Sequence, residues 1–212
     1  MKITGFFVFS LLFFSLSVSS VAQVSLGAFG GVNFGKLNGD TPKNGYYVPN
    51  GGLNTGLLID IPVGKAVSLN LQPSFSQEGT KLLFYQGKYQ EPIDSIHLRL
   101  NYFSLPLMVK VQSTSKHFYA VGGLEAGYLV SYKLTSHGDI LSNALSVAGI
   151  NVAAHFGAGY QIFIGKPVLF FELRYTQGLI NLTDEPVDKS YIPRVKTSGF
   201  KALIGVTMPL SK

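Results

Sequence analysis

The sequence predicts an all-β fold, an eight-stranded antiparallel up-and-down transmembrane β-barrel. Three observations predict it. Apolar and polar side chains alternate with a period of two in one segment after another, the connections between these segments are long and short in turn, and the chain opens with a segment typical of exported proteins. Alternation indicates strands because successive side chains of a strand point to opposite faces of the sheet.

The first 22 residues have the pattern of a secretory signal peptide. Lys2 precedes an apolar run over residues 6–16, and residues 20–22 supply the small residues of a cleavage site. A membrane anchor helix is the alternative, because the stretch after Lys2 is uncharged and about 20 apolar residues can span a bilayer. The serine-rich second half favours removal, so we expect a cleaved signal peptide at 1–22 and the barrel domain at 23–212.

The composition excludes several other classes of protein. The 212 residues are 46% hydrophobic and 13% charged and include no cysteine, which excludes disulfides, thiolate metal sites and thiol catalysis. The net charge of +6 comes from basic residues scattered singly, and no helix gathers them into the stripe that nucleic-acid binding needs. We therefore expect no nucleic-acid partner.

Eight segments alternate clearly enough to be predicted as strands, and helical periodicity is convincing nowhere. Each segment combines an apolar parity with a parity of polar residues and glycines. The predicted strands span residues 24–36, 51–61, 66–76, 97–111, 117–130, 149–162, 168–180 and 198–210.

The apolar parity can be read from each strand in order. In the first three strands its members are Val24, Leu26, Ala28, Val32 and Phe34, then Leu53, Leu57, Ile59 and Ile61, then Val67, Leu69, Leu71 and Phe75. In the last four they are Phe118, Ala120, Leu124, Ala126, Tyr128 and Val130, then Ile150, Val152, Ala154, Phe156, Ala158, Tyr160 and Ile162, then Leu169, Phe171, Leu173 and Tyr175, then Phe200, Ala202, Ile204, Val206 and Met208.

The fourth strand changes parity halfway along. Leu98, Leu100 and Tyr102 follow one parity, whereas the apolar residues from Phe103 onward follow the other. A β-bulge inserts one extra residue and so shifts the alternation by one. We therefore expect a bulge in this strand near Tyr102.

The connections decide which parity is inside. Those after the first, third, fifth and seventh strands are long and polar, whereas those after the second, fourth and sixth are only "PVGK", "QSTSK" and "FIGKP". Transmembrane barrels show this asymmetry, because their periplasmic turns are short and their extracellular loops are long. Hydrocarbon supplies no hydrogen bonds, so the sheet must close on itself, with its apolar parity toward lipid and its polar parity inside.

Aromatic side chains near the strand ends are expected at the membrane interfaces, where such barrels carry aromatic girdles. They are Phe34, Phe75, Tyr102, Phe103, Phe118, Tyr128, Tyr160 and Phe200. Further aromatic residues lie in the long connections, where they either contact an extracellular protein or glycan or fold back on the rim. They are Tyr46, Tyr47, Phe84, Tyr85, Tyr89 and Tyr191.

Several segments resemble the small outer-membrane β-barrel domain family, the porin-family proteins related in architecture to the OmpA-type eight-stranded barrel. They are "GGVNFGK" (30–36), "LNLQPSFSQEGTK" (69–81), "LNYFSLPLMVK" (100–110), "FYAVGGLEAGYLV" (118–130), "HFGAGYQI" (155–162) and "FELRYTQGLINL" (171–182). The resemblance implies an eight-stranded barrel in the cell outer membrane with both termini in the periplasm. It implies no shared reaction or ligand.

Five charged or titratable residues fall on the predicted inner parity of the last four strands: Glu125, His155, Glu172, Arg174 and Lys201. Enclosed charges are stable only when paired and hydrogen-bonded, and eight strands enclose little space, so we expect a network that fills the lumen. A narrow gated pore, in which a glutamate exchanges basic partners, is one alternative. An exported lipocalin-like carrier, with its apolar parity around a ligand, is the other.

No pattern predicts catalysis or a cofactor. The four histidines contain no H-x-x-H pair and the chain has no G-x-S-x-G elbow, so we expect no catalytic, cofactor-binding or metal site. The sequence therefore predicts a monomeric outer-membrane protein that is not an enzyme and has a structural or surface-interaction role. Its expected partners are membrane lipid and, through the loops, an extracellular protein or glycan.

Overall fold

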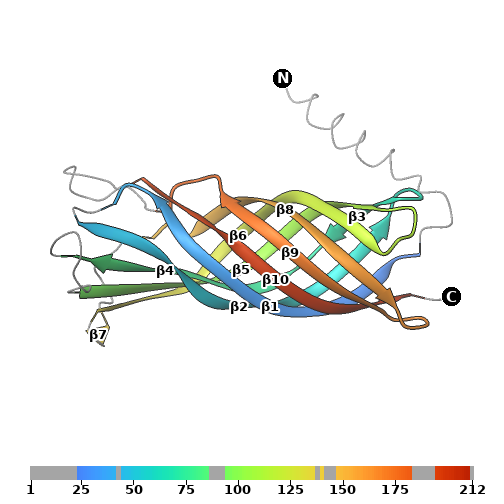
Figure 1. The fold of residues 1–212 in the computed structure, drawn as a ribbon, viewed down its shortest axis with the longest axis horizontal. Coiled ribbons are helices and arrows are strands. Elements are labelled where there is room, and N and C mark those ends of the chain that lie inside the picture. The colour runs from blue at the N-terminus through green and yellow to red at the C-terminus, as the bar shows by residue number, and fades with distance from the viewer. Residues whose placement is uncertain are drawn as a thin grey trace, which may run out of the picture.

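The computed structural model describes residues 23–41, 44–85, 94–136, 139–140, 147–182 and 194–210, so the predicted signal peptide lies outside the described residues. Among the described residues, no helix is long and apolar enough to span a bilayer. The strands form an elongated barrel (Figure 1). They are β1 (Ser25–Gly39), β2 (Gly45–Pro62), β3 (Val67–Leu71), β4 (Ser74–Phe84), β5 (Asp94–Gln112), β6 (Phe118–Ser136), β7 (Asp139–Ile140), β8 (Ile150–Phe163), β9 (Val168–Gly178) and β10 (Val195–Pro209).

The strands close into one ring with eight antiparallel positions. β1 pairs with β2 on one side and with β10 on the other, and β9, β8, β6 and β5 follow β10 around the ring. β3 and β4 share the position between β2 and β5, and the two-residue β7 pairs with the end of β6. The predicted eight-stranded up-and-down barrel is confirmed.

The third position of the ring is interrupted between β3 and β4, at Gln72 and Pro73. Proline has no N–H to donate to a ladder, which is a reason for the break. Backbone pairing nevertheless continues on both sides, because the Leu57 N–H donates to the Pro73 carbonyl at 3.0 Å and the Gln72 N–H donates to the Pro106 carbonyl at 3.1 Å. The predicted strand 66–76 is thus two strands in one position, and β4 continues to Phe84.

The apolar parity lies on the outside of the barrel. Leu173 is 69% exposed and Phe156 63% exposed, whereas the neighbouring Glu172 and His155 are 4% and 0% exposed. A soluble carrier would have the opposite arrangement, with the apolar side chains around a cavity. The predicted orientation, apolar toward lipid and polar toward the lumen, is confirmed.

The parity change of the fourth predicted strand does not come from a bulge in that strand. In β5 the buried side alternates without interruption from Leu98 to Lys110. Leu98, Leu100 and Tyr102 are therefore apolar residues inside the barrel, and Tyr102, only 1% exposed, is not part of an aromatic girdle. A bulge does lie beside Tyr102 in the pairing of β5 with β6, but not in β5, and the girdle assignment of Tyr102 was wrong, because this part of the lumen is apolar rather than polar.

The extra residue lies on the neighbouring strand, β6. Asn101 of β5 pairs with Ser131, but Tyr102 pairs with Leu129, which leaves Val130 without a partner in the register. A bulge increases local twist and bends the bulged strand. It separates the part of β6 in the membrane from the part beyond it.

Aromatic side chains surround the barrel at two levels. At one level Phe75 lies opposite Phe103 and Phe103 opposite Tyr128, and at the other the ring centroids of Phe118 and Tyr160 are 4.9 Å apart. Phe118 and Tyr128 are ten residues apart on β6. That separation is about 34 Å along a strand, or about 26 Å in height at a tilt of about 40°. It matches the apolar band of about 25 Å that outer-membrane barrels present to lipid.

The two ends of the barrel differ. The short turns 63–66, 113–117 and 164–167 lie at the same end as the start of β1 and the end of β10, which is therefore the periplasmic end (Figure 1). At the other end β2 projects together with β4, β5 and β6, since Gly45 of β2 pairs with Phe84 of β4. β5 and β6 have 19 residues each. A strand needs only about 9–11 residues to cross the membrane, so these strands continue into a wall outside it.

Candidate functional site: the barrel interior

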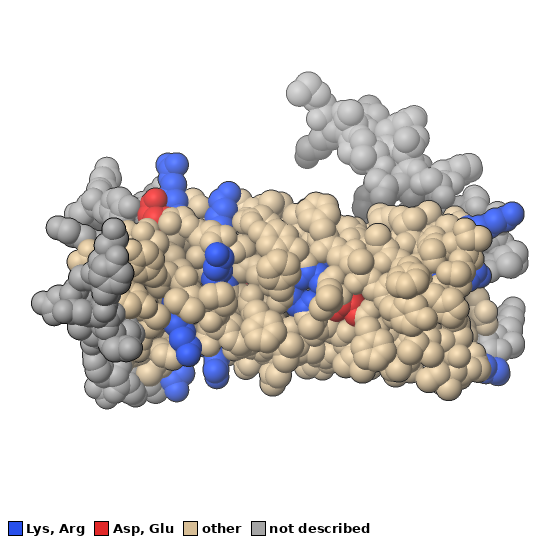
Figure 2. All heavy atoms as spheres, in the orientation of Figure 1, with Lys and Arg blue, Asp and Glu red and all other residues tan. Residues whose placement is uncertain are grey.

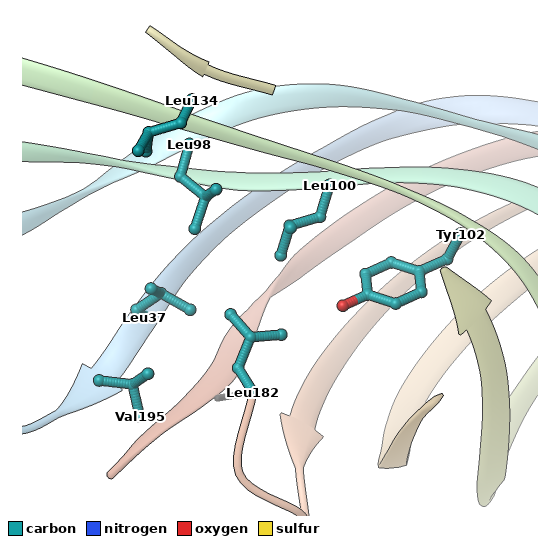
Figure 3. Packing of buried hydrophobic residues seen from close by; sticks show 7 residues of the cluster. All are labelled: Leu37, Leu98, Leu100, Tyr102, Leu134, Leu182 and Val195. Atoms are coloured by element: carbon teal, nitrogen blue, oxygen red, sulfur yellow. The ribbon is translucent and has the colours of Figure 1, made fainter. Parts of the chain in front are cut away.

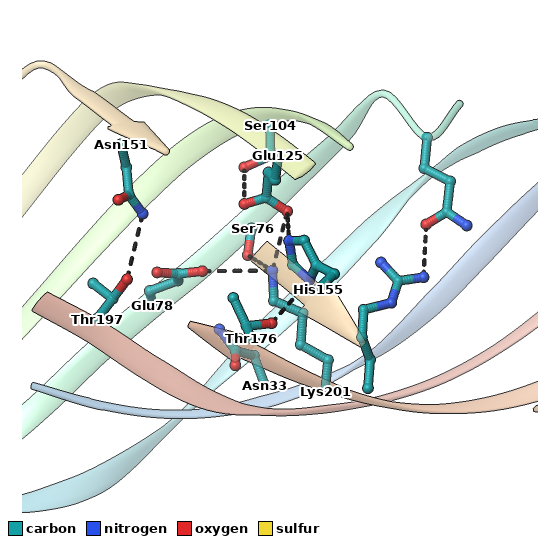
Figure 4. A network of polar contacts seen from close by, with 12 residues as sticks. Asn33, Ser76, Glu78, Ser104, Glu125, Asn151, His155, Thr176, Thr197 and Lys201 are labelled. Atoms are coloured by element: carbon teal, nitrogen blue, oxygen red, sulfur yellow. Dashed lines mark hydrogen bonds and ion pairs between the residues drawn. The ribbon is translucent and has the colours of Figure 1, made fainter. Parts of the chain in front are cut away.

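Four titratable side chains meet in the middle of the lumen (Figure 4). Lys201 of β10 points between two carboxylates, with Nζ 3.4 Å from Glu125 Oε2 of β6 and 3.5 Å from Glu78 Oε1 of β4. His155 of β8 places Nε2 2.9 Å from the same oxygen of Glu125. None of the four residues is more than 7% exposed. This central cluster connects four strands that are distant in sequence.

Short polar side chains complete the contacts of the central cluster. Ser104 Oγ donates a hydrogen bond of 3.1 Å to Glu125 Oε1, and the lysine ammonium also donates to Ser76 Oγ at 3.5 Å. Thr176 Oγ1 shares a hydrogen bond of 3.0 Å with Nδ1 of the imidazole. Buried charges are tolerated when their remaining donors and acceptors are satisfied in this way.

A second polar cluster extends from β9 toward the periplasmic end. Arg174 and Glu172 form an ion pair on this strand, and both are nearly inaccessible to solvent. Tyr119 Oη donates to Glu172 Oε2 at 2.9 Å, and Arg174 Nη2 donates to Gln72 Oε1 at 3.0 Å. Gln72 belongs to the break between β3 and β4, so the interrupted strand supplies a side chain that reaches Arg174 on β9.

The periplasmic part of the lumen contains a further ion pair and apolar side chains. Lys110 Nζ lies 3.0 Å from Asp60 Oδ2 and 4.7 Å from the centroid of the Tyr119 ring. Two small apolar clusters occupy the interior as well. They consist of Phe29, Leu58, Phe170 and Leu203, and of Met108, Tyr119 and Val121.

An apolar cluster fills the lumen on the extracellular side of the polar clusters (Figure 3). Its side chains point toward one another from several strands and from the segment after β9. We call it the apolar cap. It consists of Leu37, Leu98, Leu100, Tyr102, Leu134, Leu182 and Val195.

The structure divides the five residues predicted for the lumen between the two polar clusters. Glu125, His155 and Lys201 belong to the central cluster, and Glu172 and Arg174 to the second. All five side chains are buried inside the barrel. Their role in function stays a prediction.

Glu78 was missed, because the predicted third strand ended at residue 76 and left Glu78 in a loop. The signal was present in the sequence: Ser74, Ser76, Glu78 and Thr80 continue one polar parity, and all four are buried in the structure. The alternation therefore marked a strand that runs further than its apolar residues indicated.

The polar clusters connect strands across the lumen. Their charged groups contact one another and are enclosed between the apolar cap and the periplasmic apolar clusters. Within the described ranges, no group of three or more His, Asp or Glu side chains is arranged to hold a metal ion.

A family model described as an outer membrane protein beta-barrel domain matches residues 18–184, which is most of the chain. No match was found among curated proteins. The chain is also similar to solved structures of outer-membrane proteins at low identity. Ail, the attachment invasion locus protein of Yersinia pestis, in complex with the heparin analogue sucrose octasulfate, is 15% identical with a TM-score of 0.44, over 88% of this chain and 99% of that chain.

Two further solved structures have comparable similarity. Neisserial surface protein A is 10% identical with a TM-score of 0.48, over 89% of this chain and 97% of that chain. The outer membrane protein OprG from Pseudomonas aeruginosa is 14% identical with a TM-score of 0.42, over 89% of this chain and 95% of that chain. With a closed barrel, an outward apolar band and a family model over most of its length, the chain belongs to the outer membrane protein beta-barrel domain family and resides in the outer membrane.

Proposed function

We propose that the protein is a closed barrel that neither conducts nor catalyses, with a structural role in the outer membrane and an interaction role at its extracellular end. The observation that carries this proposal is the filled lumen. An ion on its way through would have to separate the buried pairs of the central cluster and then pass the apolar cap. Both steps leave charges without partners in a medium of low polarity, which is costly.

The closure of the sheet supports a monomer. β1 pairs with β10 along its whole length, from Ser25 opposite Pro209 to Gly39 opposite Val195. No edge of the ring is left within the membrane for a strand of another subunit to join. Lipid around the apolar band is then the partner of the membrane-spanning part.

The wall beyond the membrane supports the interaction role. Tyr46 is 63% exposed there, and its ring lies edge-on to Tyr85 at 5.7 Å. Tyr47 is folded back, because its hydroxyl donates to the Asp40 carbonyl at 3.2 Å. Tyr89 and Tyr191, the other aromatics predicted for display with Phe84, lie outside the described residues. An extracellular protein or glycan is the kind of partner that exposed tyrosines favour.

Conductance across planar bilayers tests the closed lumen. The folded protein, verified by heat-modifiable gel migration, is expected to give no stable current steps. The variants Lys201→Gln and Arg174→Gln alter the two polar clusters, and Lys36→Gln on the outer surface is the matched control. Current steps in the parent protein that change in the two lumen variants but not in the control would contradict the closed lumen. They would favour a narrow gated pore instead.

A further inference from the structure

Basic side chains gather on the outer face of the wall formed by β4, β5 and β6. We call Lys81, His97, Arg99 and Lys133 the basic patch. All four share the outward parity of their strands, opposite to that of the apolar cap. The same tendency is visible on the face drawn in Figure 2, where many Lys and Arg side chains stand beyond the tan central band, near the end with the long connections.

The register places the members of the patch side by side in two rungs. Lys81 lies opposite His97 and His97 opposite Thr135, and in the rung nearer the membrane Arg99 lies opposite Lys133. Residues directly opposite in an antiparallel pair have Cβ atoms about 4.5–5.5 Å apart, and like charges there are destabilising. The pair of Arg99 and Lys133 is therefore an arrangement that a bound anion would stabilise.

The described part of the chain supplies no acidic partner to the patch. None of its ion pairs includes Lys81, Arg99 or Lys133. Glu78, the nearest carboxylate along β4, points into the lumen toward Lys201, and Asp94 shares the inward parity of β5. The positive charges of the patch are thus not neutralised by these neighbouring acids.

The patch surrounds an open hollow that offers neutral hydrogen-bonding groups as well. Its volume is about 520 Å³, and Asn50, Ser95 and Thr135 line it together with the basic patch. Arginine binds phosphate oxygens through two parallel N–H donors, and lysine adds point charges. This combination of charges and hydroxyl and amide groups fits a phosphorylated sugar better than a bare apolar ligand.

The height of the patch relates it to the membrane surface. On β5 the outward side chains run from Phe103 of the aromatic level through Asn101 to Arg99, and Asn101 Nδ2 donates to Ser131 Oγ of β6 at 2.9 Å. Four residues correspond to about 13 Å along a strand, or about 10 Å in height at a tilt of about 40°. The long side chains of Arg99 and Lys133 can reach down from there to the head groups.

We propose that the basic patch binds the phosphorylated head group of a lipid in the outer leaflet of the outer membrane. The patch faces sideways over the bilayer rather than into the lumen, so a ligand anchored in the leaflet meets it directly. Basic clusters beside a membrane recognise anionic head groups in the same way. This inference goes beyond the closed barrel, since it holds whether or not the lumen conducts.

Lipid retention by the refolded protein tests the site. The full chain is refolded in detergent, incubated with diphosphorylated lipid A or with dephosphorylated lipid A, and the bound lipid is counted by native mass spectrometry. The test variant is R99Q/K133Q. The control K36Q/K196Q makes the same charge change at exposed, outward positions on β1 and β10, across the ring from the patch.

The parent and the control should retain phosphorylated lipid A alike, and R99Q/K133Q should bind it at least about tenfold more weakly. Dephosphorylated lipid A should be bound equally weakly by all three proteins. Equal losses in both double variants would overturn the proposal, because they would show a general effect of surface charge. Displacement of lipid A by millimolar inorganic phosphate would reassign the patch to a free anion. The same proteins are also tested for binding to heparin, and an R99Q/K133Q variant that loses heparin binding but retains lipid A would reassign the patch to a sulfated polysaccharide.

Discussion

Replacing Lys201 with methionine tests how the lumen is stabilised. Methionine has a similar length but no charge, so Glu125 and Glu78 lose the ammonium that lies 3.4 Å and 3.5 Å from them. Breaking a buried ion pair by removing one partner costs about 3–5 kcal/mol. His155 remains 2.9 Å from Glu125 and offsets part of the loss, so we expect a decrease of about 3 kcal/mol in the free energy of unfolding.

Urea unfolding in detergent or vesicles measures this decrease. The chain contains no tryptophan, so far-UV circular dichroism and gel migration are the suitable signals. At an m-value of about 2 kcal/mol/M, a loss of about 3 kcal/mol lowers the urea midpoint by about 1.5 M.

A matched variant separates lost charge pairing from lost packing. The triple change Lys201→Met, Glu78→Gln and Glu125→Gln removes the ammonium together with both carboxylates, and replacing a whole buried ionic group is often neutral. We expect it to recover most of the lost stability. The reasoning is refuted if the single variant unfolds within about 0.3 M of the parent, or if the triple variant is as unstable as the single one.

Three other variants, each with a matched control, test the lipid-facing surface, the strand spacing and the apolar cap, by the midpoint of urea unfolding or by the yield of refolding into vesicles. Leu173→Arg puts a charge at a lipid-facing position that is 69% exposed and should lower the free energy of unfolding by about 2–4 kcal/mol. Its control Ser131→Arg lies beyond the aromatic level and should lower it by only about 0–1 kcal/mol; equal costs would contradict the assigned membrane position. Gly123→Ala places a Cβ in steric conflict with the Leu107 carbonyl oxygen and should cost about 1–3 kcal/mol. Gly30→Ala has open space around it and should be nearly neutral; the reverse order would show that the strands are spaced differently. Leu100→Ala in the apolar cap should cost about 2–5 kcal/mol, against less for Leu173→Ala, which faces lipid; similar losses would mean that the cap is loosely packed.

The membrane-spanning part of the fold could be predicted because lipid and lumen impose opposite requirements on alternate residues. In β8, Phe156 is outward and His155 inward, as the period of two indicates. The same rule identified the orientation of Glu172 and Arg174. Closure of the ring followed from the absence of hydrogen-bonding partners in hydrocarbon.

The parts beyond the membrane were predicted poorly, because the outward side chains there meet water instead of lipid and need not be apolar. β4 extends past residue 76 with Glu78 inside, and the apolar residues of β5 near Leu100 turn inward to form the cap. The prediction assumed that every apolar parity faces lipid. It therefore explained the inward apolar residues of this strand by a bulge. The pairing of Glu78 with Lys201 depends on strand register, which the sequence of either strand alone does not reveal.

The pairing of β1 with β10 also determines how much of the chain must be present before the barrel can insert into the membrane. On one edge β1 pairs with β2, but on the other edge all fifteen of its residues pair with β10, the last strand of the described residues. A nascent polypeptide that lacks β10 would expose two open sheet edges to hydrocarbon, so it cannot settle in the bilayer as a smaller version of the finished barrel. Stable insertion therefore requires β10, and a truncation that removes this strand should abolish the inserted barrel rather than shorten it.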